Sequence, residues 1–242
     1  MMKTIRIAHL YYDLLNLYGE NGNIRYLVNK LENMGVKTKV DKLSVGDNIN
    51  FKNYDFFYIG SGCFESILIA LDDIMKYKSN IKEAINDKKY FLITGTGLDL
   101  FGSKIVKDGK EYEALDILNY ETIKHSDIVG SCYFNCSLIK EKVIGFQNRD
   151  SIMKNIKEDN LFSIIEGFGY DVDSKIEGIK HNNFYGTYLI GPFLIRNPYF
   201  TDMLVKNMLD EIDIKYNPCD EDISYKAYKE YLNNFYANEK AD

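Results

Sequence analysis

Two glycine-rich turns, each directly after a short apolar run, hold the residues best placed for chemistry. Gly60-Ser61-Gly62 follows the run Asp55–Ile59, and Gly95-Thr96-Gly97 follows Tyr90–Ile93. A sharp turn between a strand and a helix can present a nucleophile, or it can direct backbone N–H groups at an anion. A tight turn needs glycine in any case, so the turns alone leave catalysis, anion binding and plain chain reversal open.

Neither turn has the spacing of a nucleotide-binding loop. Leu100 stands where a dinucleotide fingerprint needs its third glycine, and no Gly-Lys-Ser/Thr follows as in a phosphate-binding loop. The four cysteines form no Cys-x-x-Cys pair, so a zinc site has little support. We therefore expect no cofactor and no metal.

Cysteine and histidine supply the usual nucleophile and base of covalent catalysis. Cys63 closes the first glycine turn and is the first candidate for a nucleophile. His181 is the histidine closest in sequence to a third glycine-rich segment, Gly186–Pro192, although a catalytic role is a minority interpretation. The remaining cysteines and histidines are expected to be structural, incidental or solvated: Cys132, Cys136, Cys219, His9 and His125.

The elements that must position these residues follow from periodicity. Compact apolar runs separated by helical stripes predict an α/β fold with a mostly parallel central sheet and flanking helices. The carboxyl ends of parallel strands share one edge, so both glycine turns should lie close together there. The predicted strands of this part are 4–10, 36–40, 55–59 and 90–93, with helices at 24–34 and 64–86 and another beginning after Gly97, capped by Thr96.

The second half of the chain predicts a small antiparallel extension followed by helices. Its short strands are expected at 128–134, 143–146, 163–165 and 185–190. Pro198 opens a helix to about 212, and an amphipathic stripe of tyrosines predicts a last helix over 224–238. We divide the chain into a main domain, 1–213, and a C-terminal helical appendage, 214–242, which covers the core or meets a partner.

Composition narrows the functional class. The 242 residues are 45% hydrophobic and 27% charged, as expected for a globular protein of one large domain. The net charge of −6 argues against nucleic acid as a partner, and no apolar run is long enough for a membrane span. Without a recognisable signal peptide we expect a cytoplasmic protein. The mixed charge runs Lys104–Glu113 and Lys154–Asp159 are interpreted as solvated loops or helix faces.

Four separated segments resemble a known family, in the family's order. They are Leu14–Asn23 (LLNLYGENGN), the Gly60–Gly62 loop, Gly145–Asn148 (GFQN) and Gly186–Pro192 (GTYLIGP). The sequence resembles the CobB/CobQ-like (cobyric acid synthase-like) branch of the class I glutamine amidotransferases, and within it the glutaminase subunits GatD of lipid II isoglutaminyl synthase. The matches extend from about residue 5 to about residue 210. The resemblance implies a class I amidotransferase fold and a Mur-ligase-like, ATP-binding partner subunit.

The departures from the family pattern concern the catalytic residues themselves. Alignment on Leu100-Phe101-Gly102 places Gly95 at the nucleophilic cysteine, and a shift by one residue would place Thr94 or Thr96 there instead, so no cysteine occupies the position. The catalytic histidine falls on Ile190. The basic residue that helps to hold glutamine in the family falls on Asp127. Glu20 falls where the family carries an acid in the N-terminal loop, and it could be a solvated loop charge. The resemblance implies an oxyanion and substrate site formed by Gly60, Ser61, Gly62, Thr96, Gly97, Asp99 and Gln147.

Three functions follow from this pattern. The first is a degenerate, GatD-like glutamine amidotransferase that serves as a non-catalytic, regulatory or scaffold subunit of a Mur-ligase-like amidating complex. The second is an active glutaminase with a relocated nucleophile, Cys63, that supplies ammonia for amidation of a cell-wall precursor or a cobyrinate-like acid. The third is a module that binds glutamine, another amino acid or a small anion beneath the two glycine turns.

Overall fold

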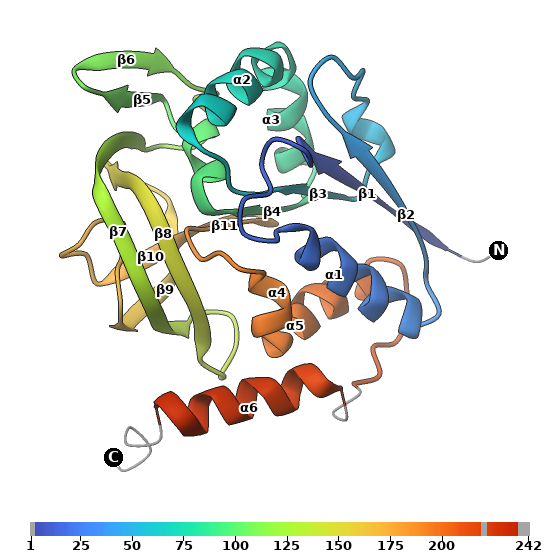
Figure 1. Cartoon of the computed structure of the whole chain (residues 1–242). Coiled ribbons are helices and arrows are strands. Elements are labelled where there is room, and N and C mark those ends of the chain that lie inside the picture. Colours follow the sequence, from blue (N-terminus) through green and yellow to red (C-terminus); the bar gives the residue numbers. More distant parts are fainter. Residues whose placement is uncertain (1–2, 219–221, 237–242) are drawn as a thin grey trace.

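The computed structural model describes residues 3–218 and 222–236, which form one sheet with helices on both faces (Figure 1). Eleven strands of this described part join in the order β2-β1-β3-β4-β11-β10-β9-β7-β5-β6, and β8 pairs with β7. The strands from β2 to β11 run parallel, and most of the later pairings are antiparallel. The expected fold, a mostly parallel sheet with an antiparallel extension, is confirmed.

The parallel half is built from short apolar strands that are buried on both faces, as βαβ connections require. Every residue of β3 and β4 is buried, and their registers align Phe56 with Tyr90 and Ile59 with Ile93. The strands of this half are β1 (Thr4–Leu10), β2 (Lys37–Leu43), β3 (Phe56–Ile59), β4 (Tyr90–Thr94) and β11 (Phe184–Thr187).

Helices cover the two faces of this sheet and divide the core in two. One cluster lies under α2 and α3 and includes Phe57 and Phe91, whose rings stack 4.6 Å apart. The other lies under α1, α4 and α5 and includes Leu27 and Phe200. The helices are α1 (Asn21–Asn33), α2 (Phe64–Ile74), α3 (Lys78–Asn86), α4 (Phe193–Arg196) and α5 (Pro198–Asp210), with single 3₁₀ turns at Phe51–Asn53 and Met75–Tyr77.

The antiparallel extension is larger than the sequence indicates. Glu121–Cys136 and Val143–Lys154 form two long paired strands, because alternation continues well beyond the apolar segments used to predict them. The interpretation of Lys104–Glu113 as a solvated loop or helix face is wrong, since these residues form a hairpin whose Ile105 is buried. The strands of this part are β5 (Lys104–Lys107), β6 (Lys110–Glu113), β7 (Glu121–Cys136), β8 (Val143–Lys154), β9 (Asp159–Glu166) and β10 (Ile176–His181).

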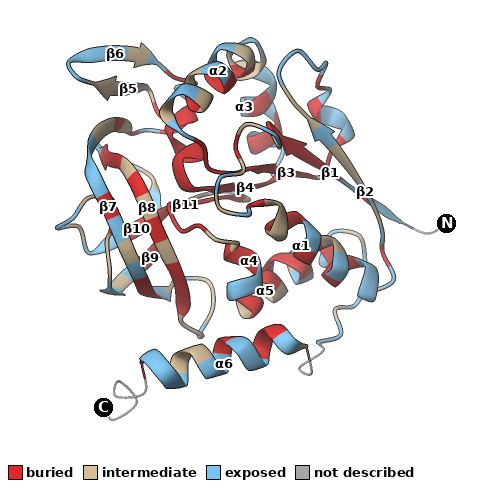
Figure 2. Ribbon diagram, viewed as in Figure 1, coloured by how far each residue is buried: buried red, intermediate tan, exposed pale blue. Residues whose placement is uncertain are grey.

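The last helix, α6 (Ile223–Phe235), lies across the end of the molecule beside α1, α4 and the β7–β8 hairpin (Figures 1 and 2). Its buried residues are Ser224, Tyr225 and Tyr228, and the hydroxyl of Tyr228 donates a 2.7 Å hydrogen bond to the carbonyl of Lys142. The expected helix of 224–238 is therefore found, although its last two predicted residues, like Cys219, lie outside the described residues. Among the described residues no helix is long and apolar enough to cross a bilayer.

Candidate functional site

The two glycine turns meet at the carboxyl edge of the parallel strands, as predicted. Gly60–Gly62 follows β3, and the second turn is the first part of a 3₁₀ helix, η3 (Gly95–Leu100), directly after β4. The Thr96 hydroxyl lies 3.1 Å from that of Ser61, and it donates to the carbonyl of Gly62 and accepts from its N–H. Thr96 therefore joins the two turns. It does not cap the regular helix expected there.

Gly95 has the backbone geometry of a nucleophile elbow but no side chain. Its φ of +58° lies in the left-handed region, where glycine is favoured and where the residue at a strand-to-helix turn is exposed to the site. A Cβ built on Gly95 would lie 2.5 Å from both Cβ and Oγ of Ser61 and 2.9 Å from Cγ2 of Ile190. The space that a nucleophile would need is therefore filled by these two side chains.

Ile190 stands opposite Gly95, where the family resemblance places a base. Only 2% of its surface is exposed, and its backbone N–H donates a 2.9 Å hydrogen bond to the carbonyl of Phe146 in β8. The structure thus brings Gly95 and Ile190, the two positions that the resemblance assigns to nucleophile and base, side by side. An isoleucine in this place packs against the turn and cannot accept a proton.

Glu20 is fully buried beneath the turns, so the interpretation of it as a solvated loop charge is wrong. One carboxylate oxygen accepts hydrogen bonds from the hydroxyls of Tyr58 and Thr94 and from the side-chain amide of Asn23. Its other oxygen, Oε1, is buried without a hydrogen-bond partner among the described residues. Burial raises the pKa of Glu20, and the hydrogen bonds from Thr94 and Tyr58 only partly oppose this rise.

Asp99, one of the predicted substrate residues, is fully buried and already has a cationic partner. The ammonium of Lys124 lies 2.8 Å from the Asp99 carboxylate and 2.8 Å from that of Asp150. The Ser151 hydroxyl donates a further 2.7 Å bond to Asp99. Burial alone would lower the pKa of Lys124, but the attraction of Asp99 and the bonds to both carboxylates outweigh burial and raise it. An internal amine thus neutralises Asp99.

Gln147, the last predicted substrate residue, is buried within a second polar cluster. It donates to the carbonyl of Phe168 at 3.0 Å and accepts from Nε of Arg149 at 2.9 Å. The Arg149 guanidinium lies 4.0 Å from the ring centroid of Tyr188. Glu177 accepts a 2.6 Å bond from the N–H of Tyr188, and burial raises the pKa of Glu177 to about 7 against the opposing effect of that bond.

Sequence reasoning missed Lys124, Arg149 and Glu177. One signal was available for the β8 members: Gln147, Arg149 and Ser151 alternate along a strand and therefore share one face. Lys124 and Glu177 carry no such signal, because their burial depends on pairings between distant strands.

The other cysteine and histidine candidates do not lie at the elbow formed by Gly95 and Ile190. Cys63 is exposed at the start of α2, and its Sγ lies 3.3 Å from the Ser66 hydroxyl. His181 pairs with Glu158 at 3.0 Å, at the Phe184 end of β11, whereas the site lies at the Thr187 end. His9 is buried against Tyr58, and both His125 and Asp127 are exposed in β7. In the described part of the chain no group of three or more His, Cys, Asp or Glu side chains could hold a metal ion.

Comparisons with known proteins agree with this architecture. The GatD subunit of lipid II isoglutaminyl synthase (glutamine-hydrolyzing) from Streptococcus pneumoniae is 30% identical over 243 aligned positions, 98% of this chain and 91% of that protein. The GatD subunit from Staphylococcus aureus is 31% identical over 223 positions, 91% of each chain.

Solved structures with about 9% sequence identity share the fold. A glutamine amidotransferase from Thermotoga maritima has a TM-score of 0.51, with 87% of this chain and 86% of that one covered. The glutaminase domain of Trypanosoma brucei CTPS with bound acivicin has a TM-score of 0.52, with coverages of 88% and 96%. The model of the CobB/CobQ-like glutamine amidotransferase domain matches residues 6–198. The chain therefore belongs to the CobB/CobQ-like glutamine amidotransferase family.

Proposed function

We propose that this chain is a degenerate, GatD-like subunit that does not hydrolyse glutamine and acts as a scaffold or regulatory subunit of an amidating complex. The observation that carries the proposal is the elbow at Gly95, where the backbone geometry of a nucleophile is kept and the side chain is absent. Glutaminase chemistry of this family's kind needs a thiolate and a nearby base, and neither Gly95 nor Ile190 can supply one. Loss of such groups together leaves only oxyanion stabilisation and binding.

The packing around the elbow supports a loss of glutamine hydrolysis that one substitution cannot reverse. Ser61 and Ile190 fill the volume that a nucleophile at position 95 would occupy, with a closest distance of 2.5 Å from a Cβ at that position. Real Cβ contacts do not come that close, so a cysteine there would require these side chains or the turn to move. A single substitution back to cysteine would therefore not restore a working site.

The Lys124–Asp99 ion pair supports a weakened substrate site. A free amino acid presents an ammonium group, which a buried carboxylate could bind, but Lys124 already contacts Asp99 at 2.8 Å with its side chain 4% exposed. An entering ammonium would have to displace this internal amine and the Ser151 hydroxyl. We infer that glutamine binds poorly at this position.

The names of the relatives supply the pathway of the proposal. Both GatD proteins are subunits of lipid II isoglutaminyl synthases, so we propose that this chain joins a Mur-ligase-like, ATP-binding partner in amidation of a peptidoglycan precursor. The two alternatives are weaker. A relocated nucleophile lacks a base, because Cys63 forms no hydrogen bond with a described histidine. A binding module lacks an evident pocket, because neither glycine turn lines any of three cavities found in the described part of the chain.

Reconstitution with the partner separates a scaffold from an ammonia source. The amidation rate of the complex is measured with glutamine and, separately, with ammonium chloride as the nitrogen donor. We expect amidation with ammonium, stimulated by this chain, and none with glutamine. Equal rates with glutamine would refute the proposal. If that activity disappeared on Cys63→Ala, the nucleophile would have moved to Cys63.

A further inference from the structure

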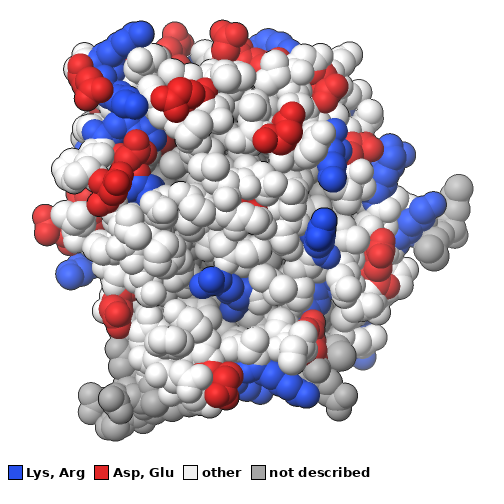
Figure 3. Space-filling model, in the orientation of Figure 1, with Lys and Arg blue, Asp and Glu red and all other residues white. Residues whose placement is uncertain are grey.

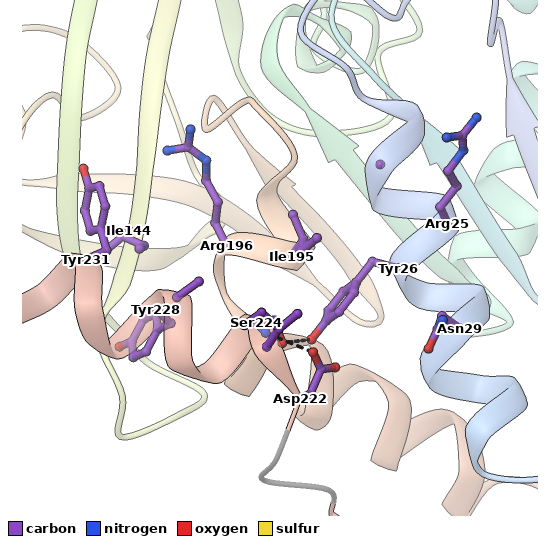
Figure 4. Close-up of a pocket in the computed structure, with 13 residues that line it drawn as sticks. Arg25, Tyr26, Asn29, Ile144, Ile195, Arg196, Asp222, Ser224, Tyr228 and Tyr231 are labelled. Carbon is purple, nitrogen blue, oxygen red and sulfur yellow. Dashed lines mark hydrogen bonds between the residues drawn. The ribbon is translucent and has the colours of Figure 1, made fainter.

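A cavity of about 680 Å³ lies between α1, α4 and α6 (Figure 4). Two helical stripes form its walls, since the lining residues of α1 and of α6 each recur at spacings of three and four. The lining comprises Gly22, Arg25, Tyr26 and Asn29 of α1, Ser224, Ala227, Tyr228 and Tyr231 of α6, Asp222 and Ile223 at the start of α6, Ile195 and Arg196 of α4, and Ile144 of β8. This volume is within the range of small-molecule sites, about 300–1,000 Å³.

Most of the cavity wall is apolar or aromatic, but it carries two guanidinium groups. Figure 4 shows Arg196 rising from α4 beside Tyr231 and Arg25 rising from α1, with Ile195 between the two arginines in this view. Within residues 3–218 and 222–236, no carboxylate forms an ion pair with either arginine. On the face that Figure 3 shows, the middle of the surface is mostly uncharged and most charged side chains lie toward its edges.

The acidic residue of the lining does not neutralise them. Asp222 caps α6 through a 2.9 Å bond from the N–H of Ser224, and it lies 3.5 Å from the ammonium of Lys30. The hydroxyl of Tyr26 is also engaged, with Ser224 at 2.7 Å. The polar groups at the base of α6 are thus satisfied among themselves, while neither guanidinium group is paired with a carboxylate of the described residues.

We propose that this cavity binds a small organic anion, in which a carboxylate, phosphate or sulfonate meets Arg25 and Arg196 and an apolar body lies against Ile195 and Tyr231. Guanidinium groups bind such anions through paired hydrogen bonds, and aromatic walls favour a flat apolar body. The site is separate from the degenerate elbow, and the proposal does not depend on the loss of glutaminase activity.

The cavity is connected to the elbow through one short segment. A guanidinium nitrogen of Arg196 lies 3.9 Å from a Cβ built on Gly191, which follows Ile190 directly, and a Cβ on Gly22 would lie 2.4 Å from Cγ of Pro192. Ligand binding at Arg196 would thus act on the segment that closes the elbow. A ligand in the cavity could thereby change the position of Ile190 at the elbow.

The test uses 8-anilinonaphthalene-1-sulfonate, a flat aromatic anion, and the uncharged N-phenyl-1-naphthylamine as its matched control. Affinities are measured by fluorescence titration and equilibrium dialysis on the folded full chain. We expect one sulfonate site per chain, about tenfold weaker in Arg25→Ala and in Arg196→Ala, weaker again at high salt, and unchanged in Lys82→Ala, an exposed residue of α3. Ala227→Trp should block both probes.

Two results would overturn the proposal. Sulfonate affinity unchanged in both arginine variants and in Ala227→Trp would mean that the cavity is not the binding site. Loss of both probes in Ala227→Trp without any arginine dependence would mean an apolar groove, fit for a side chain of a partner protein. Near-ultraviolet circular dichroism checks that each variant is folded, and the arginines are exposed, so their replacement leaves the core intact.

Discussion

The elbow at Gly95 allows a quantitative test of why this position lacks a side chain. In Gly95→Ala, the new Cβ would lie 2.5 Å from the Ser61 side chain and 2.9 Å from Ile190. Overpacking of this kind costs about 1–3 kcal/mol. A left-handed φ of +58° adds about 1–2 kcal/mol for a residue with a Cβ. We therefore expect Gly95→Ala to lower the free energy of unfolding by about 2–5 kcal/mol.

A matched glycine separates the two contributions. Gly35 also has a left-handed φ, +77°, but a Cβ there would have nothing within 4 Å, so Gly35→Ala reports backbone strain alone. Ser61→Gly removes the atoms at 2.5 Å, and the double variant with Gly95→Ala should recover the part of the steric cost that Ser61 causes, up to about 1–3 kcal/mol, while the contact with Ile190 remains. Ser61→Gly by itself loses the hydroxyl contact with Thr96, which is why the full double-mutant cycle is needed.

Urea denaturation provides the assay, with the slope of the transition compared among variants to check that they unfold in the same way. Equal costs for Gly95→Ala and Gly35→Ala, or additive effects of Gly95→Ala and Ser61→Gly, would refute the claim that Ser61 occupies the nucleophile's space. A large coupling energy between Gly95→Ala and Ser61→Gly would mean that a cysteine at position 95 also requires the replacement of Ser61.

Three further predictions concern two buried charged groups and the exposure of two cysteines. Lys124→Met should cost about 3–5 kcal/mol in urea denaturation, because Asp99 stays buried without its partner, and Asp99→Asn in the same chain should recover much of it; additive losses would contradict this. The pKa of Glu177 is raised from 4.5 to about 7, so its contribution to the free energy of unfolding is complete below pH 4.5 and is lost as the pH rises through 7. The loss should be about 3 kcal/mol, and Glu177→Gln should not show it. Parallel pH profiles of stability for the two proteins would disprove this prediction. Exposed Cys63 should react with a thiol reagent in the native state, in a phase missing from Cys63→Ala, whereas Cys132, whose pKa burial raises to about 12, should react only on unfolding; fast labelling of Cys132 would contradict its burial.

The sequence predicted the parallel half of the fold well because its signals are local. Tyr90–Ile93 is apolar throughout and is followed by Thr94 and Gly95, and Gly35 marks the end of α1. The β5–β6 hairpin was missed because its residues are mostly charged, and only Ile105 and the pairing with β7 show that it belongs to the sheet.

The site was predicted in position but not in its interactions. The strand ends predicted that Gly60 and Gly97 approach each other, and a Cβ on Gly97 would indeed lie 2.4 Å from the Gly60 carbonyl. No sequence pattern indicated that Lys124 would reach Asp99, because the contact depends on the pairing of Lys124 in β7 with Ser151 in β8, which also bonds to Asp99. Glu20 looked solvated in its polar loop, but it is buried, and its carboxylate accepts hydrogen bonds from the hydroxyls of Tyr58 and Thr94, which lie on distant strands.

Release of ammonia from glutamine tests the central claim most directly. The purified chain, and its complex with a ligase-like partner, are incubated with glutamine, and ammonia is quantified against Cys63→Ala and a buffer control. Because Gly95 and Ile190 provide neither nucleophile nor base, we predict no release above the control in either preparation. Clear, enzyme-dependent release that disappears on Cys63→Ala would contradict the account and place a working nucleophile at Cys63.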